Sequence, residues 1–354
     1  MNPSSADVPR KTVMPPEVIL QHVLHGEDVL QRRAMAKAIT LLESTRADHR
    51  AQGDALLTGL LPATGKAFRI GISGVPGVGK STLIENFGLY LIEQGYRVAV
   101  LAIDPSSTLS GGSILGDKTR MERLSVHPKA YIRPSPSSGN LGGVAEKTRE
   151  AMLICEAAGY DVVIVETVGV GQSEIAVANM TDVFVLLQLP NAGDDLQAIK
   201  KGVMELADLV LINKADIDPD AATRAQAQIT SALRLLGMHG HPDRSAAAHG
   251  GEDAPAAWTA QVMPISALQA KGLAPLWQAL CQFQHLQQAR GEWSARRQQQ
   301  ALAWMWERIH SELVHHFREH TQVKAMLPAL QQQVLAGEIA PSTAARQLLA
   351  AQKT

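Results

Sequence analysis

Short apolar runs alternate with segments of helical periodicity through the middle of the chain. The run from Phe68 to Ser73 predicts a buried strand, and a helix is expected from Thr82 to Tyr96 because apolar residues recur there on one face. Further strands are expected at residues 97–103, 131–134, 160–165 and 182–189, and at the apolar runs that begin at residues 209 and 262. Strands that alternate with helices in this way are typical of an α/β fold with a mostly parallel sheet.

Both ends of the chain carry helical patterns outside this alternation. Residues 16–26 and 27–44 predict two helices, which a hairpin packed against the core would explain. Later helical patterns lie at residues 273–286, 302–317 and 327–335 and after Pro341. We expect an N-terminal helical extension at residues 1–60, a central domain at 61–290 and a C-terminal helical extension at 291–354. A second copy of the chain would cover the apolar faces of the last helices, so a homodimer is expected.

The charge balance argues against nucleic acid as a partner. The 33 basic and 34 acidic residues are interspersed and give a formal net charge of −1, so the sequence predicts no polyanion-binding surface. Cys155 and Cys281 lie far apart in apolar helical stretches, which favours reduced core thiols over a disulfide or a zinc site. Neither a signal-peptide pattern nor a run of about 18 apolar residues occurs, so we expect a cytoplasmic protein that does not enter a membrane.

The first predicted strand runs into GVPGVGKS, which fits the pattern G-x-x-x-x-G-K-[ST]. In this pattern backbone N–H groups cradle phosphates, the lysine reaches the β- and γ-phosphate oxygens, and the hydroxyl holds Mg²⁺. A Gly-rich turn that binds nothing is the alternative, but the strand–loop–helix context favours a phosphate site. The predicted phosphate-binding residues are Gly74, Val75, Pro76, Gly77, Val78, Gly79, Lys80, Ser81 and Thr82.

Two later strands are expected to end in carboxylates, at the sheet edge where ligands bind in open α/β folds. Asp104 is a candidate Mg²⁺ partner, although a capping Asp before Pro105 is the structural alternative. Glu166 is placed to hold the water shell of Mg²⁺, and the N–H of Gly169 is placed to reach a γ-phosphate. This is the layout of a Walker-B/switch element, with Glu where many nucleotide-hydrolysing proteins have Asp.

Two irregular segments have competing interpretations. Residues 109–128 mix Gly, Ser and charge and predict a mobile loop. Asp117 and Lys118 could approach the nucleotide, so this loop is a switch candidate; a plain surface loop is the alternative. The segment from Met238 to Trp258 is rich in His, Gly, Ala and Asp. Because its histidines are irregularly spaced and no cysteine accompanies them, a solvated insertion is favoured over a metal site.

The sequence NKAD, Asn213 to Asp216, follows a predicted strand on the C-terminal side of the phosphate motif. A carboxylate at Asp216 can accept both N1–H and N2–H of guanine while the stem of Lys214 packs on the base, and adenine offers no such pair of donors. The motif therefore indicates GTP rather than ATP. The loop placed to back the base contains Ser266, Ala267 and Leu268.

With these motifs assembled, the chain resembles the methylmalonyl-CoA mutase-associated GTPases, the MeaB/ArgK group of P-loop proteins. The resemblance spans nearly the full length and rests on RRAMAKAITLLES, GVPGVGKST, AIDPSS, GGSILGDKTRM, RPSPSSGNLGG, ETVGVGQSE, LPNAGDDLQAIKKG, NKAD and SAL. It implies a Rossmann-like P-loop GTPase domain with helical N- and C-terminal extensions, dimerising through the C-terminal one. It also implies a GTP-hydrolysing chaperone of an adenosylcobalamin-dependent mutase, which gates cofactor loading and protects the mutase from inactivation.

The resemblance also assigns roles by position. Lys80 and Ser81 are implied in binding phosphate and Mg²⁺, and Lys200 in a switch loop that faces the partner or the nucleotide. Solvation of a helix start is the alternative role of Lys200. The implied acidic Mg²⁺ shell and its switches comprise Asp104, Asp117 and Glu166.

Two other protein classes are compatible with the phosphate motif. A nickel-delivering GTPase would be expected to carry a Cys or His cluster near its switches, and neither cysteine lies in such a setting. A P-loop kinase would need an acceptor pocket, for which the sequence offers no motif. Val170, after Gly169, stands where Ras-type GTPases carry a water-orienting glutamine, so slow intrinsic GTP hydrolysis is expected.

Overall fold

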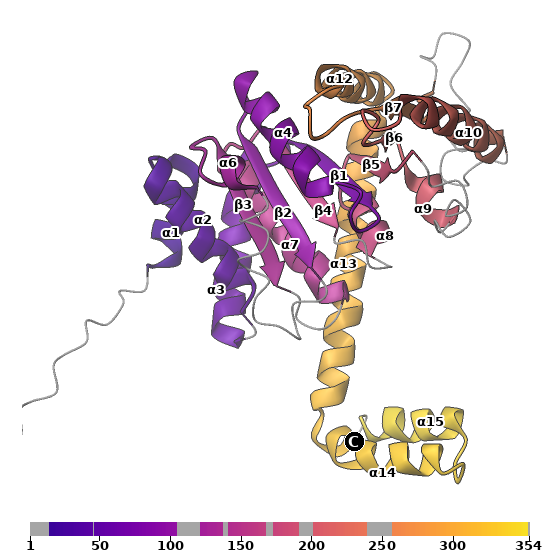
Figure 1. The fold of residues 1–354 in the computed structure, drawn as a ribbon. Helices are drawn as coiled ribbons and strands as arrows, with labels where there is room; N and C mark the ends of the chain where they lie inside the picture. The colour runs from indigo at the N-terminus through magenta and orange to yellow at the C-terminus, as the bar shows by residue number, and fades with distance from the viewer. Residues whose placement is uncertain are drawn as a thin grey trace, which may run out of the picture. The chain divides into compact units, whose positions relative to one another are not determined.

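Seven strands form one sheet in the order β3-β2-β4-β1-β5-β6-β7 (Figure 1), and every neighbouring pair is parallel. The computed structural model describes residues 14–44, 46–104, 121–136, 141–167, 173–190, 201–238 and 257–352. The strands are β1 (Phe68–Gly74), β2 (Val98–Asp104), β3 (Ala130–Pro136), β4 (Val162–Thr167), β5 (Val183–Gln188), β6 (Leu209–Ile212) and β7 (Gln261–Pro264). The predicted α/β fold with a mostly parallel sheet is confirmed.

Helices connect these strands and extend the chain at both ends. Before the sheet come α1 (Pro16–His25), α2 (Asp28–Leu42), α3 (Ala47–Leu60) and the 3-10 turn η1 (Leu61–Ala63). Between strands lie α4 (Lys80–Glu93), α6 (Glu122–Ser125), α7 (Leu141–Ala157), α8 (Ser173–Ala178), α9 (Lys201–Leu206) and α10 (Pro219–Met238). After β7 follow α12 (Leu273–Ala289), α13 (Glu292–Glu319), α14 (Thr321–Leu335) and α15 (Pro341–Ala351).

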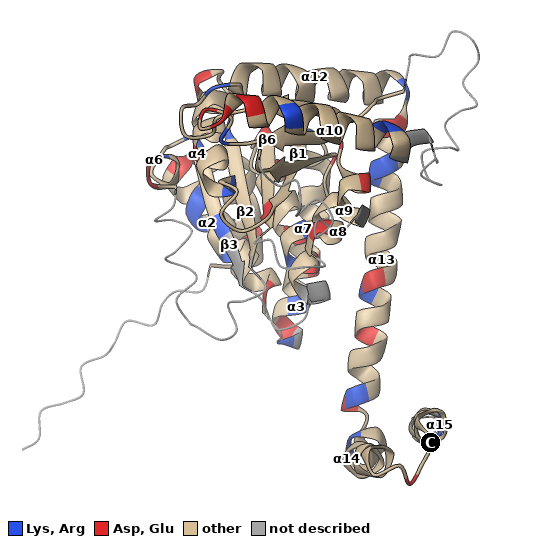
Figure 2. Cartoon of the chain, turned by 45° about the vertical axis from the view of Figure 1, so that its right-hand side comes forward, with Lys and Arg blue, Asp and Glu red and all other residues tan. Residues whose placement is uncertain are grey.

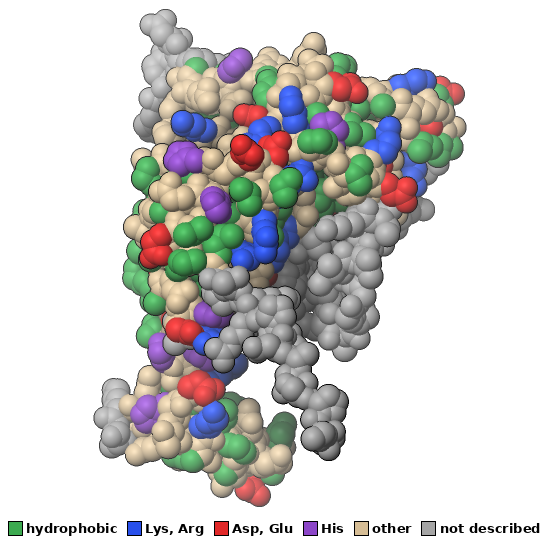
Figure 3. All heavy atoms as spheres, turned by 90° about the vertical axis from the view of Figure 1, so that its left-hand side faces the viewer, with side chains coloured by type: hydrophobic (Ala, Val, Ile, Leu, Met, Phe, Trp, Pro, Cys, Tyr) green, Lys and Arg blue, Asp and Glu red, His purple; other side chains and the backbone are tan. Residues whose placement is uncertain are grey.

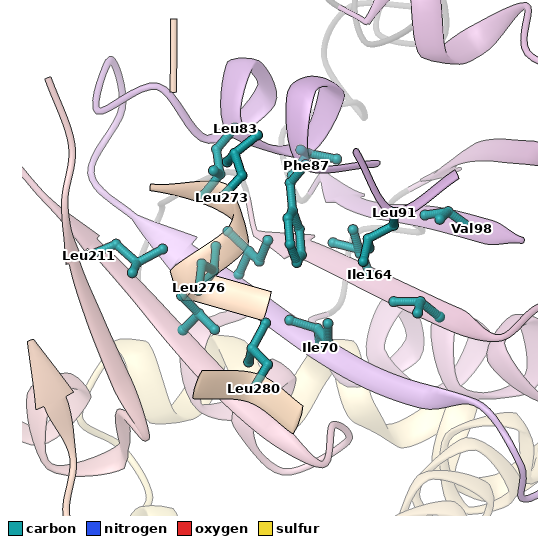
Figure 4. Packing of buried hydrophobic residues seen from close by; sticks show 14 of the residues in the cluster. Ile70, Leu83, Phe87, Leu91, Val98, Ile164, Leu211, Leu273, Leu276 and Leu280 are labelled. Atoms are coloured by element: carbon teal, nitrogen blue, oxygen red, sulfur yellow. The ribbon is translucent and has the colours of Figure 1, made fainter. Parts of the chain in front are cut away.

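The main hydrophobic core lies between one face of the sheet and helices α4 and α12. Figure 4 shows side chains of both helices directed at the strands, with Phe87 of α4 and Leu280 of α12 beside Ile70 of β1. Alternate residues of each strand supply this face, because successive side chains of a strand point to opposite sides of the sheet. The core therefore fixes where α4 begins, directly behind the end of β1.

The other face of the sheet is covered by α7 and α8, and the N-terminal helices α1–α3 pack against α7 (Figure 1). A buried ion pair joins the layers, since Arg69 Nε of β1 lies 2.5 Å from Glu156 Oε1 of α7. On the face that carries α1–α3, hydrophobic and charged side chains are mixed (Figure 3). Basic and acidic residues are also interspersed along the described helices (Figure 2).

Three local predictions differ from the structure. The helix expected from Thr82 to Tyr96 is α4, which begins two residues earlier because Gly79 acts as its N-cap, and which ends at Glu93. The N-terminal extension contains a third helix, α3, in addition to the two predicted, and its packing against α2 and α7 stabilises a rather polar sequence. The predicted loop at residues 109–128 contains the short helix α6 in its described part.

Both cysteines are free thiols, with Cys155 buried in α7 and Cys281 half-buried in α12. Burial raises the pKa of each thiol, which keeps it protonated. None of the helices in the described residues combines the length and the apolar character that crossing a membrane requires.

The chain divides into two compact units, Met1–Arg296 and Arg297–Thr354. In the second unit, α14 and α15 enclose a small core of Val323, Leu330, Ala344 and Leu348. The apolar stripe predicted on α13 is exposed in this chain: Leu302, Trp306 and Leu313 have exposed fractions of 58%, 55% and 58%. These three side chains therefore do not belong to a core of the described chain, whereas Phe317 at the end of the stripe packs against the core of α14 and α15.

Candidate functional site

The loop between β1 and α4 is a tight turn that depends on glycine residues in left-handed backbone conformations. Gly77 and Gly79 have φ values of +78° and +99°, a region of backbone conformation that L side chains rarely adopt. With these two left-handed residues the chain turns from the end of the strand directly into the first turn of α4. The first backbone N–H groups of α4 and the positive end of the helix dipole meet at that turn, so the arrangement can bind an anionic phosphate group.

The side chains of Lys80 and Ser81 lie at the two sides of this loop. Lys80 is buried, and its Nζ donates to the carbonyl oxygens of Gly74 at 2.6 Å and Val75 at 3.2 Å. Ser81 Oγ donates to Glu166 Oε1 at 3.2 Å. The structure thus brings the first turn of α4 into contact with the Glu166 carboxylate near the end of β4.

The ends of β1, β2 and β4 meet because the three strands are parallel neighbours. Ile72 of β1 and Ala102 of β2 both pair with Glu166, so the last residue of β2, Asp104, lies at the same edge of the sheet. Ser81 Oγ and the Glu166 carboxylate offer the hard oxygen donors that Mg²⁺ prefers. Among the described residues, no group of three or more His, Cys, Asp or Glu side chains is arranged to hold a metal by itself. A site with few protein ligands suits Mg²⁺, which also takes oxygen ligands from phosphates and water.

The NKAD segment and the loop after β7 are joined to the phosphate loop by one buried amide. Asn213 is 1% exposed; its Nδ2 donates to Val78 O at 2.7 Å, and its Oδ1 accepts the N–H of Ala267 at 2.9 Å. Lys214, held at φ +62°, donates from Nζ to Gly77 O at 3.0 Å. The stem of this lysine therefore extends from the NKAD segment to the phosphate loop, as packing along a bound base requires.

Two contacts at this end were not predicted from the sequence. Gln269 Nε2 donates to Asp216 Oδ2 at 3.2 Å, and Asn86 Nδ2 of α4 donates to Ala267 O at 2.8 Å. Ser266 is buried, whereas Leu268 is 79% exposed. No motif identifies Gln269 or Asn86, because each reaches its partner through the fold alone.

Several predicted site residues lie outside the described residues: Asp117, Gly169, Val170 and Lys200. The same holds for most of the His-rich segment, of which only Met238 and residues 257–258 belong to described parts of the chain.

A parallel sheet with a glycine-rich loop between β1 and α4, and with NKAD at the end of β6, defines a P-loop GTPase. The chain belongs to the family of the methylmalonyl Co-A mutase-associated GTPase MeaB, whose model matches residues 35–322. The resemblance noted from the sequence is thereby confirmed.

Known relatives are similar over most of the chain. A putative GTPase of Caulobacter vibrioides is 53% identical over 332 residues, which cover 94% of this chain and 96% of that protein. The mitochondrial methylmalonic aciduria type A homolog of Mus musculus is 47% identical over 335 residues, 92% of this chain and 77% of that protein. A crystal structure described as LAO/AO transport system kinase has a TM-score of 0.69 at 35% identity and covers 99% of this chain and 100% of that chain.

Proposed function

We propose that this GTPase is a chaperone of an adenosylcobalamin-dependent acyl-CoA mutase of the methylmalonyl-CoA mutase type, gating cofactor loading and protecting the mutase from inactivation. The observation that carries the proposal is the family match across residues 35–322, since the family is described by its association with that mutase. The name of the mouse relative, which refers to methylmalonic aciduria, supports the same partner. The mutase itself is the substrate of the chaperone, and the binding and hydrolysis of GTP control when the chaperone acts.

In this proposal the nucleotide lies across the carboxyl edge of the sheet. The Lys80 ammonium neutralises the β- and γ-phosphates, for which it turns from the carbonyl oxygens of Gly74 and Val75 that it contacts in this structure. Ser81, Asp104 and Glu166 would hold Mg²⁺, which would neutralise charge on the phosphates. Asp216 accepts the two guanine donors, with Lys214 along the base.

Switching follows from the γ-phosphate. Held between Lys80 and the N–H of Gly169, it orders the loops that contain Asp117 and Lys200, and GDP lacks these contacts. A partner that binds one of the two surfaces more tightly changes nucleotide affinity by the same factor. The mutase is therefore proposed to bind in a nucleotide-dependent way and to accelerate GTP hydrolysis.

The exposed stripe of α13 supports a homodimer. Leu302, Trp306, Ile309 and Leu313 recur at helical spacing and are all exposed in this chain. A second copy that packs on the stripe would remove this apolar surface from water.

The test is the GTPase rate measured against mutase concentration for wild type, Lys200→Ala and Lys201→Ala. The mutase is expected to raise the wild-type rate, and Lys200→Ala to weaken this rise while leaving GTP affinity nearly unchanged. Lys201→Ala, one residue away and of equal charge, is the matched control and should follow wild type. A flat wild-type curve would reject the mutase as partner, and superimposed curves for all three proteins would reject the role of Lys200. Phosphate release without transfer to an acceptor separates a GTPase from a kinase in the same assay.

A further inference from the structure

The loop after β7 is a closed turn that presents one amide side chain. Ser266 and Lys271 exchange both backbone hydrogen bonds, at 3.1 and 3.0 Å, and so close the loop at its base. Within it, Ser266 Oγ accepts the N–H of Gln269 at 3.2 Å. The backbone of Gln269 is therefore fixed near the tip of the loop, although its side chain is exposed.

The same loop is anchored from two other elements. Its Ala267 N–H is bound by Asn213 of the NKAD segment, and its Ala267 carbonyl by Asn86 of α4. These two buried or half-buried bonds set the distance between the loop and the NKAD segment. At that distance the Gln269 amide reaches Asp216 Oδ2, 3.2 Å away.

We propose that Gln269 is a positioning residue for guanine recognition, because its amide holds the Asp216 carboxylate at the angle that accepts both donors of the base. The inference rests on the proposed role of Asp216 in binding guanine. The terminal torsion of an aspartate is soft, so an unsupported carboxylate rotates over a broad range. A carboxylate oxygen has two lone pairs, so Oδ2 can accept from Gln269 and from the base at the same time.

This role differs from that of a structural glutamine. The Gln269 side chain is exposed, so its replacement should change folding stability little. Gln226 of α10 provides the contrast, since its Nε2 donates to Val262 O of β7 at 2.8 Å and so ties a helix to the sheet. Loss of the Gln269 amide should change which base is bound, whereas loss of the Gln226 amide should change stability.

The experiment compares GDP with IDP, whose base lacks the 2-amino group and so offers the carboxylate one donor in place of two. Calorimetric affinities are measured for wild type, Gln269→Met, Gln269→Lys and Gln226→Met, with melting temperatures beside them. Gln269→Met keeps the length of the side chain and removes its donor. This variant should lower the affinity for GDP about three- to tenfold and the affinity for IDP by less, so the ratio of the two affinities becomes smaller. Gln269→Lys restores a donor to Asp216 and should retain the wild-type ratio, as should the control Gln226→Met.

A wild-type GDP-to-IDP ratio in Gln269→Met would overturn the inference. An equal narrowing in Gln269→Met and Gln269→Lys would overturn it as well, because the donor would then not matter. Asp216→Asn separates the two levels of the proposal. If Asp216→Asn also keeps the wild-type ratio, Asp216 does not bind the base and the proposed function of this end of the site fails. If Asp216→Asn changes the wild-type ratio of GDP to IDP affinity while Gln269→Met keeps it, only the role of Gln269 is rejected.

Discussion

The phosphate end and the base end of the proposed nucleotide site are built by different means. At the phosphate end, consecutive residues of β1, its loop and α4 form the cradle, and a buried bond between Ser73 Oγ and Thr167 Oγ1 of 2.8 Å ties it to β4. At the base end, side-chain amides join segments far apart in the sequence, with Asn213 between two loops and Asn86 between α4 and the loop after β7. One end is a continuous piece of backbone, and the other is an assembly of loops.

This difference determines which substitutions should impair each end. A backbone cradle depends on conformation, so it tolerates side-chain changes except at its glycines, its lysine and its hydroxyl. An assembly of loops depends on each bridging amide, since a buried donor or acceptor without a partner costs about 1–3 kcal/mol. Substitutions at the two ends should therefore separate phosphate binding from base selection.

The largest effect is expected from Lys80→Ala, which breaks the phosphate end alone. Removing the ammonium would abolish the charge-assisted bonds proposed between Lys80 and two phosphates, so GTP and GDP affinity should fall about a hundredfold or more. Calorimetry measures the loss, and circular dichroism should show an intact fold. Lys66→Ala, an exposed lysine just before β1, is the control and should bind like wild type. Unchanged GTP turnover in Lys80→Ala would contradict the proposed role.

Asp216→Asn breaks the base end alone. An amide group places a donor against the guanine donors, so GDP affinity should fall by about 2–3 kcal/mol while xanthine nucleotides gain. Competition between GDP and XDP measures the change. Asp218→Asn is the matched control, because Asp218 Oδ1 accepts the N–H of Ala221 at the start of α10 and asparagine caps helices equally well. An unchanged preference for GDP over XDP would show that another group selects the base.

Asn213→Ala should damage both ends at once. It leaves Val78 O and the Ala267 N–H without their buried partner, which we expect to cost about 2 kcal/mol of folding stability along with nucleotide affinity. Asn213→Asp separates the two bonds, since an aspartate still accepts the N–H of Ala267 but cannot donate to the carbonyl oxygen of Val78. Thermal unfolding with and without GDP measures both effects. If Asn213→Ala is as stable as wild type, the bridge between the two ends contributes little.

The smallest effect is expected from Asn86→Ala. Asn86 supports the loop after β7 from α4, and its Oδ1 also accepts from Arg123 Nη2. Losing the bond to Ala267 O should lower GDP affinity by about 1 kcal/mol and leave pyrophosphate binding unchanged. Arg123→Ala removes the second bond only and serves as the control. Equal losses of GDP affinity in the two variants would indicate that Asn86 acts by anchoring α6 and not by supporting the loop after β7.

The strand–loop–helix conformation of the proposed phosphate end is predicted well from the sequence because its geometry is local. Strand, loop and helix are consecutive there, so the glycine, lysine and serine spacing describes the structure directly. The meeting of Ser81 with Glu166 also follows from the sequence, since parallel strands bring their carboxyl ends to one edge.

The base end is predicted only in part. The motif NKAD marks Asp216, but Gln269 reaches it across 53 residues and depends on a turn in which Ala270 adopts φ +54°. The bond from Asn86 to Ala267 spans 181 residues and requires the packing of α4 on the sheet. Helix α3 was not predicted from the sequence, since its contacts with α2 and α7 stabilise it more than its own apolar pattern does.

Gly79 lies where the two ends touch. A Cβ at this position would stand 2.5 Å from Asn213 Nδ2, and Asn213 cannot move aside without losing its bonds to Val78 and Ala267. The glycine of one motif is thus required by the asparagine of the other, in addition to the backbone turn. In evolutionary terms the two motifs are not free to drift separately: any lineage that replaces this glycine must first have rebuilt the asparagine's surroundings, so substitutions at the two positions should be inherited together.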